Sequence, residues 1–510
     1  MIFEWSSEAG TAPPQGDVRC LIISEAQAQG EGLAADWAAR VRLLSAAGLF
    51  SGKQGQVYVL PVMDPPEQPV VILAGCGKGQ MGMPELRQLM AQTARAAYRL
   101  KAATLVVQIP AALGGPAGAL MAEQAGQAIA EGLVLGSYRR RQYKLEQAFY
   151  AGLDTVQLRM ERKSEAAEEE AWRQGIKRGQ ALGEAANLAR DLTNRPGNLL
   201  TPSGLAVAAI EIAERHGLPA EVLDERELEL KGMGGLLAVG HGSVNPPRMI
   251  VIRYQGTSQW ENAVAIVGKG ITFDTGGISL KRAAGMESMF SDMAGAAAVL
   301  AVMDALGHLR PKVNVVMLIP AAENMPAANA FKPGDIITSL SGRTIEIINT
   351  DAEGRIILGD ALTYARQWGA QRIIDVATLT GAVASILGDV ATGAVTNDQA
   401  FLEEILVASR LSGEQIWPLP VYPEFRELLT SEVADLRNAA GRYGAASTAG
   451  LFIGEFAEGL PWVHLDIAGT AFLSAERGVN PKGATGVMVR TLLEYLLRAA
   501  AEPDNFSAET

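Results

Sequence analysis

Residues 263–277 read AVAIVGKGITFDTGG. The opening run, 263–267, is rich in β-branched residues and is followed by turn residues, so it predicts a β-strand. The stretch after it holds a lysine, an aspartate and a Gly-Gly pair. Apolar runs of this kind alternate with helical patterns along the chain, which favours an α/β fold with a mixed sheet.

Similar runs occur in both halves of the chain and predict further strands. In the first third they lie at 18–24, 56–62, 70–74 and 103–109. Helical spacing there marks residues 33–47, 84–100 and 118–135. In the remainder, strands are predicted at 249–254, 313–319, 344–348, 372–377 and 462–465.

The 510-residue length favours two or three domains rather than one core. A charge-rich helical pattern over residues 164–193 ends at a cluster of helix-breaking residues, 194–198. We therefore expect a smaller N-terminal α/β domain at 1–163 and a connecting helix at 164–193. Residues 194–510 should form a larger C-terminal α/β domain with a mixed central sheet.

Composition narrows the range of partners and compartments. The chain has 44 lysines and arginines against 56 acidic residues, a net charge of −12, which argues against general affinity for nucleic acid or anionic membranes. Its two cysteines, Cys20 and Cys76, cannot form a disulfide framework, so a reduced, cytoplasmic compartment is expected. Neither a secretory signal nor a membrane span is expected from the hydropathy pattern.

Acidic residues gather near predicted strand ends in the second half. Asp351 and Glu353 are two positions apart, so in an extended segment both carboxylates can face one ion. Helical periodicity over residues 355–368 predicts that the pair lies at a strand-to-helix turn. Carboxylates that close repel each other unless a cation neutralises them. Asp274 precedes the Gly-Gly turn, and Asp292 opens an alanine-rich helix whose burial makes a lone carboxylate costly. Four carboxylates without histidine favour magnesium, manganese or zinc.

The same residues also admit a structural interpretation. An Asp-x-Glu before a helix is typical of a capping device, and Asp292 alone can be an N-cap. Lys269 can form a salt bridge to Asp274. Gly268-Lys269-Gly270 is weak evidence for phosphate binding, since no Walker pattern follows it. Composition and spacing alone leave the metal site and the structural interpretation open.

Longer motifs resemble the leucyl aminopeptidase (cytosol aminopeptidase) family of dinuclear metallopeptidases. Residues 349–355, NTDAEGR, match that family's most specific motif over seven consecutive positions. The resemblance is strong over residues 194–493 and faint over residues 1–160. Supporting blocks occur in the family's order at 267–281, 289–297, 320–326, 332–335, 375–381 and 464–470.

The resemblance implies a metalloprotease of the aminopeptidase type, a hydrolase that releases N-terminal residues such as leucine from peptides. It implies two divalent ions per subunit, manganese or zinc, and a bicarbonate ion near Arg355. The metal ligands implied by motif position are Lys269, Asp274, Asp292, Asp351 and Glu353. Lys281 and Arg355 fall on the two catalytic positions that are not ligands. The pocket for the first side chain is implied at Met289, Thr378, Leu379 and Gly381.

The resemblance also implies a cytoplasmic homohexamer that acts in peptide turnover. Four positions depart from the family's usual pattern: Ile356 stands where leucine is usual, and Arg282 where proline is common. Phe290 replaces a frequent lysine and Phe472 a frequent tryptophan. Both phenylalanine changes bear on the preferred first residue and leave the reaction unchanged.

Two alternatives remain from the sequence. The loop at residues 75–79, GCGKG, follows a predicted strand and would suit a nucleotide phosphate. The resemblance adds a DNA-binding role, because some members of the family bind DNA, so a DNA- or nucleotide-binding regulatory role beside or instead of peptidase activity stays open. A dinuclear hydrolase of another amide or ester is the second alternative. His464, in a strand-like run, is interpreted as a core histidine with satisfied hydrogen bonds rather than a ligand.

Overall fold

The computed structural model describes residues 1–6, 17–33, 35–60, 70–79, 81–111, 113, 120–145 and 152–501. Parts of three predicted elements lie outside these residues: position 34, positions 61–62 and positions 118–119. The chain divides into two compact units. The first is Met1–Glu184 with Glu476–Pro481, and the second is Ala185–Ala475 with Lys482–Thr510.

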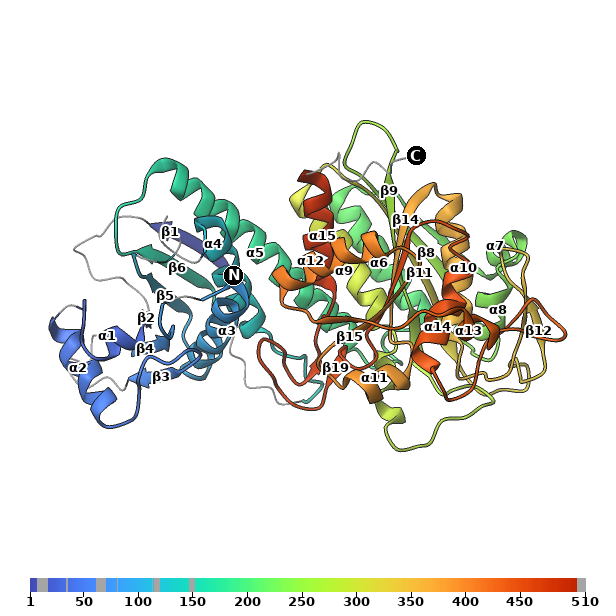
Figure 1. Ribbon diagram of the computed structural model, residues 1–510, viewed down its shortest axis with the longest axis horizontal. Helices are drawn as coiled ribbons and strands as arrows, with labels where there is room; N and C mark the ends of the chain where they lie inside the picture. The colour runs from blue at the N-terminus through green and yellow to red at the C-terminus, as the bar shows by residue number, and fades with distance from the viewer. Residues whose placement is uncertain are drawn as a thin grey trace. The chain divides into compact units, whose positions relative to one another are not determined.

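The first unit is an α/β domain around one mixed sheet (Figure 1). Its strands are β1 (Ile2–Ser6), β2 (Val18–Ile23), β3 (Val57–Leu60), β4 (Val70–Gly75), β5 (Thr104–Ile109) and β6 (Thr155–Met160). Its helices are α1 (Glu25–Ala28), α2 (Ala35–Ala46), α3 (Met83–Arg99), α4 (Ala122–Ser137) and α5 (Ala166–Thr193), the last running on into the second unit. The strand order is β1-β6-β5-β2-β4-β3, and only β3 is antiparallel to its neighbour.

Both faces of this sheet are buried, as the continuous apolar run of β2 requires. Cys20 and Ile22 pack into the core under α3 and α4, while Leu21 and Ile23 pack into a separate core with α1 and α2. Successive residues of a strand point to opposite faces, so one run serves two cores.

Six residues from late in the chain complete the first unit. Within the segment Glu476–Pro481, the backbone oxygen of Gly478 accepts a hydrogen bond of 2.7 Å from Nη1 of Arg95, on α3. The same Arg95 nitrogen lies 3.2 Å from Oε1 of Glu476. The predicted segmentation had placed this segment with the rest of the C-terminal part.

The second unit is built on a nine-stranded mixed sheet in the order β16-β15-β18-β14-β9-β11-β8-β7, with β10 paired to β11. Its strands are β7 (Ala220–Leu223), β8 (Arg248–Gln255), β9 (Ala263–Gly268), β10 (Gly270–Asp274), β11 (Asn314–Asn324), β14 (Ala370–Ala377), β15 (Thr392–Thr396), β16 (Ile416–Pro418) and β18 (Trp462–Asp466). Small sheets are formed by β12 (Ile336–Thr338), β13 (Thr344–Glu346) and β17 (Leu436–Arg437), and by β19 (Phe472–Leu473) and β20 (Gly483–Ala484).

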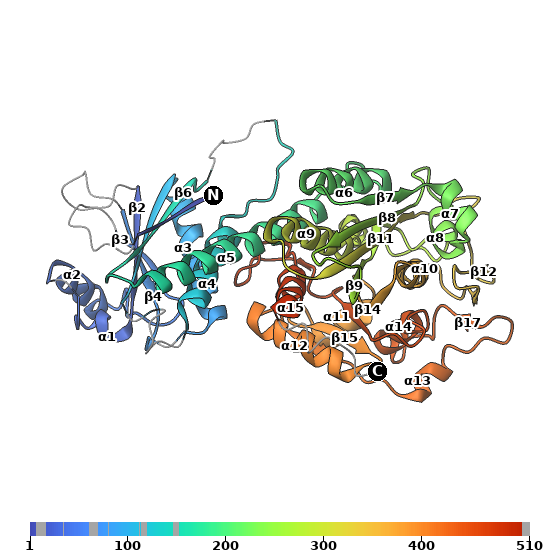
Figure 2. The ribbon, with the colours of Figure 1, turned by 90° about the horizontal axis from the view of Figure 1, so that it is seen from above.

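Helices cover both faces of this large sheet (Figures 1 and 2). Contacts group α6, α9 and α15 on one side and α8, α10 and α14 on the other. The helices are α6 (Pro202–His216), α7 (Glu225–Lys231), α8 (Gly234–Gly240), the 3₁₀ helix η1 (Met286–Ser291), α9 (Ala294–Leu309), α10 (Gly354–Gln367), α11 (Gly381–Leu387), α12 (Gln399–Ser412), α13 (Pro423–Glu427), α14 (Ala445–Gly454) and α15 (Val489–Ala501).

Among the residues that the structure describes, one helical stretch, Met286–Leu309, is long and apolar enough to cross a membrane by length and composition. However, 83% of its most apolar window is buried inside the second unit. Helix α9, which makes up most of this stretch, packs against β9 and β14 and between α6 and α15. Its hydrophobic composition is therefore explained by its place in the core.

Candidate active site

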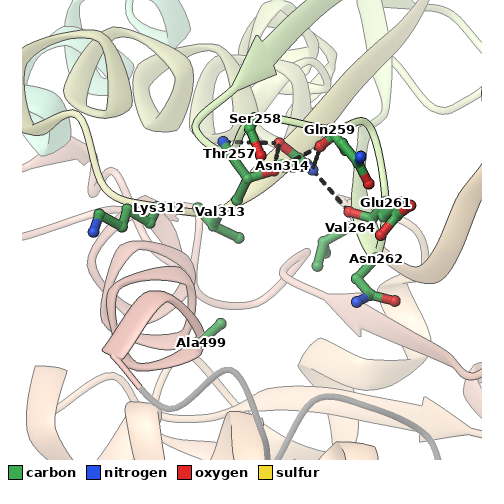
Figure 3. Close-up of a pocket in the computed structure, with 10 residues that line it drawn as sticks. All are labelled: Thr257, Ser258, Gln259, Glu261, Asn262, Val264, Lys312, Val313, Asn314 and Ala499. Atoms are coloured by element: carbon green, nitrogen blue, oxygen red, sulfur yellow. Dashed lines mark hydrogen bonds between the residues drawn. The ribbon is translucent and has the colours of Figure 1, made fainter.

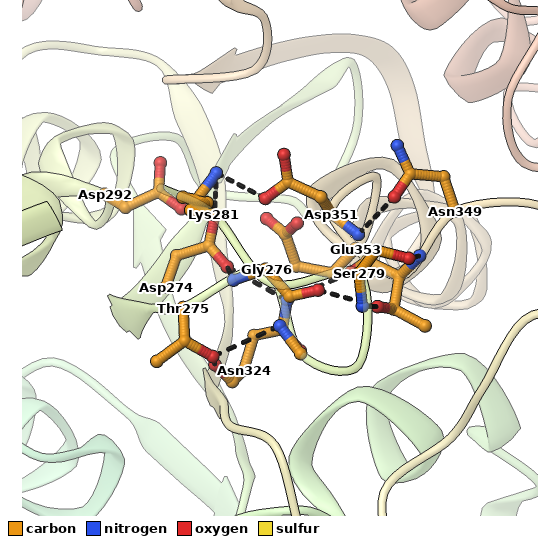
Figure 4. Close-up of polar contacts among 12 residues, drawn as sticks. Asp274, Thr275, Gly276, Ser279, Lys281, Asp292, Asn324, Asn349, Asp351 and Glu353 are labelled. Atoms are coloured by element: carbon orange, nitrogen blue, oxygen red, sulfur yellow. Dashed lines mark hydrogen bonds and ion pairs between the residues drawn. The ribbon is translucent and has the colours of Figure 1, made fainter. Parts of the chain in front are cut away.

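Polar residues converge where the central parallel strands of the second unit end. Lys269 follows β9 directly, Asp274 is the last residue of β10, and Thr378 follows β14. Because β9, β10, β11 and β14 run parallel, their carboxyl ends meet at one edge of the sheet, where ligand sites of α/β folds lie. Figure 4 shows the acidic side chains turned toward one another there.

We use the name carboxylate cage for the six charged residues that meet here: Lys269, Asp274, Lys281, Asp292, Asp351 and Glu353. Nζ of Lys269 lies 2.8 Å from Oδ2 of Asp292 and 2.8 Å from Oε1 of Glu353. Nζ of Lys281 lies 2.8 Å from Oδ2 of Asp274 and also contacts Oδ1 of Asp351. The alternative in which Lys269 pairs with Asp274 is wrong, since Lys281 is the lysine that contacts Asp274.

The cage is acidic and mostly buried, and this shifts its proton affinities. Four carboxylates face two ammonium groups, so full ionisation would leave a charge of −2. Burial raises the pKa of Asp292 to about 8 against the charge of Lys269, and burial with the charge of Glu353 raises the pKa of Asp274 to about 6. The cage therefore retains protons near neutral pH.

The pKa of Lys269 is raised, whereas binding of a metal ion to its nitrogen requires a neutral amine and therefore a lowered pKa. Burial lowers the pKa of Lys269, but the charges of Asp292, Glu353 and Asp274 outweigh burial and hold the pKa above its usual range. As the groups stand, Lys269 is an ammonium ion. A cation that binds to its nitrogen must first displace a proton.

The turn before α10 brings two of the acids together. Asp351 lies in a turn, and Glu353 is the N-cap of α10 with helical φ and ψ of −77° and −36°. The predicted strand-to-helix turn is therefore confirmed, and the backbone at Glu353 is helical rather than extended. The two carboxylates of this turn can both face one ion, as predicted, since one oxygen from each of Asp274, Asp351 and Glu353 lies within 4.8 Å of the other two.

Glycines allow the cage to close this tightly. Gly276 has φ of +85°, and a Cβ atom there would lie 2.9 Å from Oδ1 of Asp351. A Cβ atom on Gly354 would lie 2.5 Å from Cε of Lys269. Only glycine tolerates both the left-handed backbone at position 276 and the approach of the lysine to the first turn of α10.

Three buried polar residues outside the predicted site hold the cage and its rim. Nδ2 of Asn324 donates to Oδ1 of Asp274 at 2.9 Å. The backbone oxygen of Asn438 accepts from Nη1 of Arg355 at 2.9 Å, and its side chain bonds to backbone groups of residues 348 and 349. Oδ2 of Asp466 accepts from Oγ1 of Thr380 at 2.7 Å.

A usable signal existed for two of these residues. Asn324 and Asp466 are the last residues of β11 and β18, so they repeat the pattern of a polar residue at a strand end that marks Asp274. Asn438 follows a strand of only two residues, β17, which no sequence periodicity can reveal.

The predicted pocket residues lie on two segments beside the cage. Thr378 joins it directly, since its Oγ1 donates to Oδ1 of Asp292 at 2.6 Å and its backbone oxygen accepts from Nζ of Lys269 at 3.0 Å. The backbone N–H of Leu379 donates to Asp466. Gly381 begins α11, and Met289 lies in η1, three residues before Asp292.

Two residues that depart from the family pattern meet each other. The rings of Phe290, also in η1, and Phe472, in β19, stand edge to face with centroids 5.8 Å apart. Aromatic pairs prefer this geometry. The two substitutions therefore form one apolar contact.

His464 is fully buried, and its Nδ1 lies 2.6 Å from Oδ1 of Asp375. The other ring nitrogen, Nε2, has no hydrogen-bond partner among the described residues. The core position of His464 is thus confirmed, whereas the prediction that its hydrogen bonds are satisfied is wrong for Nε2.

The donor set of the cage fits divalent cations. Four carboxylates and one amine are oxygen and nitrogen donors of the kind that manganese and zinc accept. Two dications would offset the charge of the four carboxylates, and with Lys269 neutral the ammonium group of Lys281 would leave the cage with a charge of +1. Oδ1 of Asn324, fully buried beside Asp274, has no hydrogen-bond partner among the described residues.

Comparison with models of known protein families identifies the family of this chain over most of its length. Residues 187–493 match the cytosol aminopeptidase family, catalytic domain, and residues 24–147 match the cytosol aminopeptidase family, N-terminal domain. This chain belongs to the cytosol aminopeptidase family. Cytosol aminopeptidases are peptidases, so the chain is a hydrolase of peptide bonds with aminopeptidase function.

Relatives and solved structures agree with this assignment. A probable cytosol aminopeptidase of Alkaliphilus metalliredigens is 45% identical over 87% of this chain and 88% of its own length. One from Bacillus subtilis is 48% identical over 74% of this chain and 75% of its own. Among structures, a mutant tomato leucine aminopeptidase aligns with a TM-score of 0.83 at 32% identity, over 97% of this chain and 96% of its own.

A second similar structure is a complex with Mn. The bottromycin maturation enzyme BotP, in complex with Mn, aligns with a TM-score of 0.83 at 35% identity, over 95% of this chain and 99% of its own.

The loop at residues 75–79 does not support the nucleotide-binding alternative. The N–H of Cys76 donates to the backbone oxygen of Ile23 at 2.9 Å, and that of Gly77 donates to Gly52 at 2.8 Å. A phosphate would need these amide groups, and both are already bonded.

A cavity of about 240 Å³ lies away from the cage, at the amino ends of β9 and β11 (Figure 3). Its polar wall is held together from within: Nδ2 of Asn314 donates at 2.8 Å to Oγ1 of Thr257 and to two backbone oxygens. Because these polar groups bond to one another, we assign no binding or catalytic role to this cavity.

Proposed function

We propose that the carboxylate cage binds two divalent ions, manganese or zinc, and that the chain uses them to remove N-terminal residues from peptides. The observation that carries the proposal is the meeting of four carboxylates and two lysines at the carboxyl end of the sheet. The names of the relatives support the peptide substrate, and the Mn complex of BotP supports the metal.

The ligands in this proposal are Lys269, Asp274, Asp292, Asp351 and Glu353. Glu353 contacts Lys269 and Asp274 contacts Lys281, and one oxygen of each lies within 4.8 Å of the other, which supports a shared role for these two acids. When bound, such ions lower the pKa of a shared water and polarise the scissile carbonyl. Lys269 would take part as a neutral amine, which the surrounding acids oppose until cations enter.

Lys281 has a different role, because it is a donor outside the ligand set. Its ammonium group contacts Asp274 and Asp351, and these carboxylates hold its pKa above the usual range although burial lowers it. A permanently charged donor at this place would stabilise the negative charge that develops on the carbonyl oxygen.

Arg355 is the second catalytic residue of the proposal. Its guanidinium is buried, and burial lowers its pKa to about 10, so it remains charged at neutral pH. Nη1 donates to Asn438, while Nε has no hydrogen-bond partner among the described residues. A buried cation with a spare N–H suits a small anion such as bicarbonate, which we propose binds here.

Substrate selection would rest on the free amine of the peptide. A neutral α-amine is a ligand of the same type as the Lys269 nitrogen, whereas an acylated nitrogen is a poor ligand. We place the first side chain beside Met289, Thr378, Leu379 and Gly381. The relatives' names support a cytoplasmic location, and we further propose a homohexamer, which light scattering would reveal as a particle of six chains.

The decisive experiment compares leucine p-nitroanilide with N-acetyl-leucine p-nitroanilide, using the manganese-loaded chain. Hydrolysis of the free amine and no measurable hydrolysis of the acetylated form is the expected result. Equal rates would contradict amine recognition and favour a general amide or ester hydrolase. The Asp351→Asn variant, assayed alongside, should hydrolyse neither.

A further inference from the structure

A second cluster of metal-binding side chains lies outside the carboxylate cage. His216 is the last residue of α6, and Asp304 and His308 are one turn apart on α9. One potential ligand atom from each lies within 4.8 Å of the others. Nε2 of His216 is 2.7 Å from Oδ1 of Asp304, and Nε2 of His308 is 3.9 Å from Oδ2.

This cluster is separate from the cage. Asp292 precedes α9, whereas Asp304 and His308 lie in its second half. Because a helix rises 1.5 Å per residue, the twelve positions from Asp292 to Asp304 correspond to ~18 Å. A ligand at one end of α9 therefore does not share donors with a ligand at the other.

The position of His216 depends on a glycine inside α9. A Cβ atom on Gly307 would lie 2.2 Å from Cγ and 2.5 Å from Cδ2 of the His216 ring, so no larger residue fits. Glycine destabilises a helix interior, but here the missing side chain of Gly307 leaves the space that the imidazole of His216 occupies. Arg310 fixes the same residue from the backbone, since its Nη2 donates to the oxygen of His216 at 2.6 Å.

The two imidazoles are held close together. Their rings stand edge to face with centroids 4.5 Å apart. The side chain of His216 is 5% exposed, that of Asp304 is 13% exposed and that of His308 is 56% exposed. Two donors are thus fixed by packing, and the third can rotate on the surface to close around an ion.

Two imidazoles and one carboxylate form the donor set typical of zinc with a water in the fourth position. Zinc bonds of ~2.0–2.1 Å in a tetrahedron place donor atoms ~3.3 Å apart. Nε2 of His216 is 2.7 Å from Oδ1 of Asp304 and Nε2 of His308 is 3.9 Å from Oδ2, so with each imidazole beside its own carboxylate oxygen the first contact must lengthen and the second must shorten, each by less than ~1 Å.

One competing cation faces the same carboxylate. Nη1 of Arg215 lies 2.9 Å from Oδ1 of Asp304, and its side chain is 52% exposed. Exposed ion pairs of this kind contribute little. Arg215 can therefore move into solvent when a divalent ion takes its place.

We propose that His216, Asp304 and His308 form a zinc site that ties the carboxyl end of α6 to the last turns of α9, independent of the carboxylate cage. Zinc there would bind only to the folded chain, because the three donors come from two helices. Its expected effect is on stability rather than on peptide hydrolysis.

The test counts zinc ions per chain after dialysis against zinc. His308→Ala and Asp304→Asn should each bind one ion fewer than the unaltered chain, while His241→Ala, which removes an exposed histidine elsewhere, should bind the same number. An equal count in all four proteins would overturn the proposal. In manganese-supported hydrolysis, His308→Ala should keep the activity of the unaltered chain.

Two further measurements separate this site from the cage. In an Asp351→Asn background, His308→Ala should still remove one zinc ion, whatever the cage binds. Gly307→Ala keeps all three donors but displaces the His216 ring, so it should also lose that ion, with folding checked by circular dichroism. Anomalous scattering at the zinc edge should place the ion between His216 and His308; scattering only at the cage would contradict the site.

Discussion

The Nζ atom of Lys269 lies 2.8 Å from Oδ2 of Asp292, and both side chains are buried beside two more carboxylates. The four acids of this cluster outnumber its two lysines, so some of its carboxylates hold protons near neutral pH. Any cation that enters must exchange with these protons, so metal binding and proton binding are linked at this position.

Metal binding should therefore release protons and strengthen as pH rises. The pKa of Asp274 is raised to about 6 and that of Asp292 to about 8, so both carboxylates are protonated at pH 5 and both are ionised at pH 9. Only the ionised forms bind a dication, so affinity should increase across this window. Isothermal titration of manganese in buffers of different ionisation enthalpy measures the release. An affinity that stays constant from pH 5 to 9 would contradict the linkage.

Lys269→Met should reduce the number of ions held by the cage from two to one. Methionine fills similar space but offers no amine, so one ion loses a ligand that the four carboxylates cannot replace. Turnover should fall by at least about 100-fold, because mutation of residues that only orient metal ligands already lowers activity by about 10–100-fold. Lys312→Met, at an exposed lysine, is the control. Two bound ions with full turnover would remove Lys269 from the ligand set.

Asn438→Ala should lower activity more than its loss of stability explains. The Asn438 side chain holds the backbone at positions 348 and 349, and its own backbone oxygen accepts from Arg355. Alanine keeps the backbone oxygen that accepts from Arg355, but loss of the buried side-chain bonds should cost about 1–3 kcal/mol of unfolding free energy. Because the loop before Asp351 loosens, kcat should fall at temperatures well below unfolding.

Asn397→Ala serves as the matched control for that experiment. Asn397 also bonds to two backbone groups, the N–H of Trp462 and the oxygen of Leu460, but it has no contact with the cage residues. If both variants lose the same fraction of activity, Asn438 has no positioning role.

The two thiols should be inert in the folded chain. Burial raises the pKa of Cys20 to about 12 and that of Cys76 to about 11, so neither forms thiolate at pH 8. Ellman's reagent at pH 8 should label no thiol in the native chain and two in guanidinium chloride. Raised pKa values stabilise the fold below the unfolded value of roughly 8.5, and this contribution is lost as pH rises through 11 to 12. Rapid native labelling would contradict the burial.

Sequence patterns predicted the positions of the cage residues along the chain, but they did not predict which lysine contacts which acid. The positions of Asp274 and Lys269 at strand ends follow from apolar runs that stop at charged residues, and β9, β11 and β14 lie where those runs predicted strands. Which lysine meets which acid depends on the turn before α10, and that turn is set by packing rather than by local sequence.

Other features were hidden for related reasons. The edge strand β1 has a partly exposed sequence, IFEWS, without the continuous apolar run that marked its neighbours. Asn438 is separated by more than 80 positions from the loop that it holds, and no local rule connects the two. Contacts between distant segments are the part of the fold that periodicity cannot reach.

The contact of Arg95 with Gly478 has a consequence for the order in which the protein is made. Residues up to Glu184 leave the ribosome long before Glu476–Pro481 are translated, and at ~5–20 residues per second the delay is on the order of tens of seconds. The first unit of the chain is thus among the last to be finished, and a nascent chain of 184 residues lacks the piece that binds Arg95.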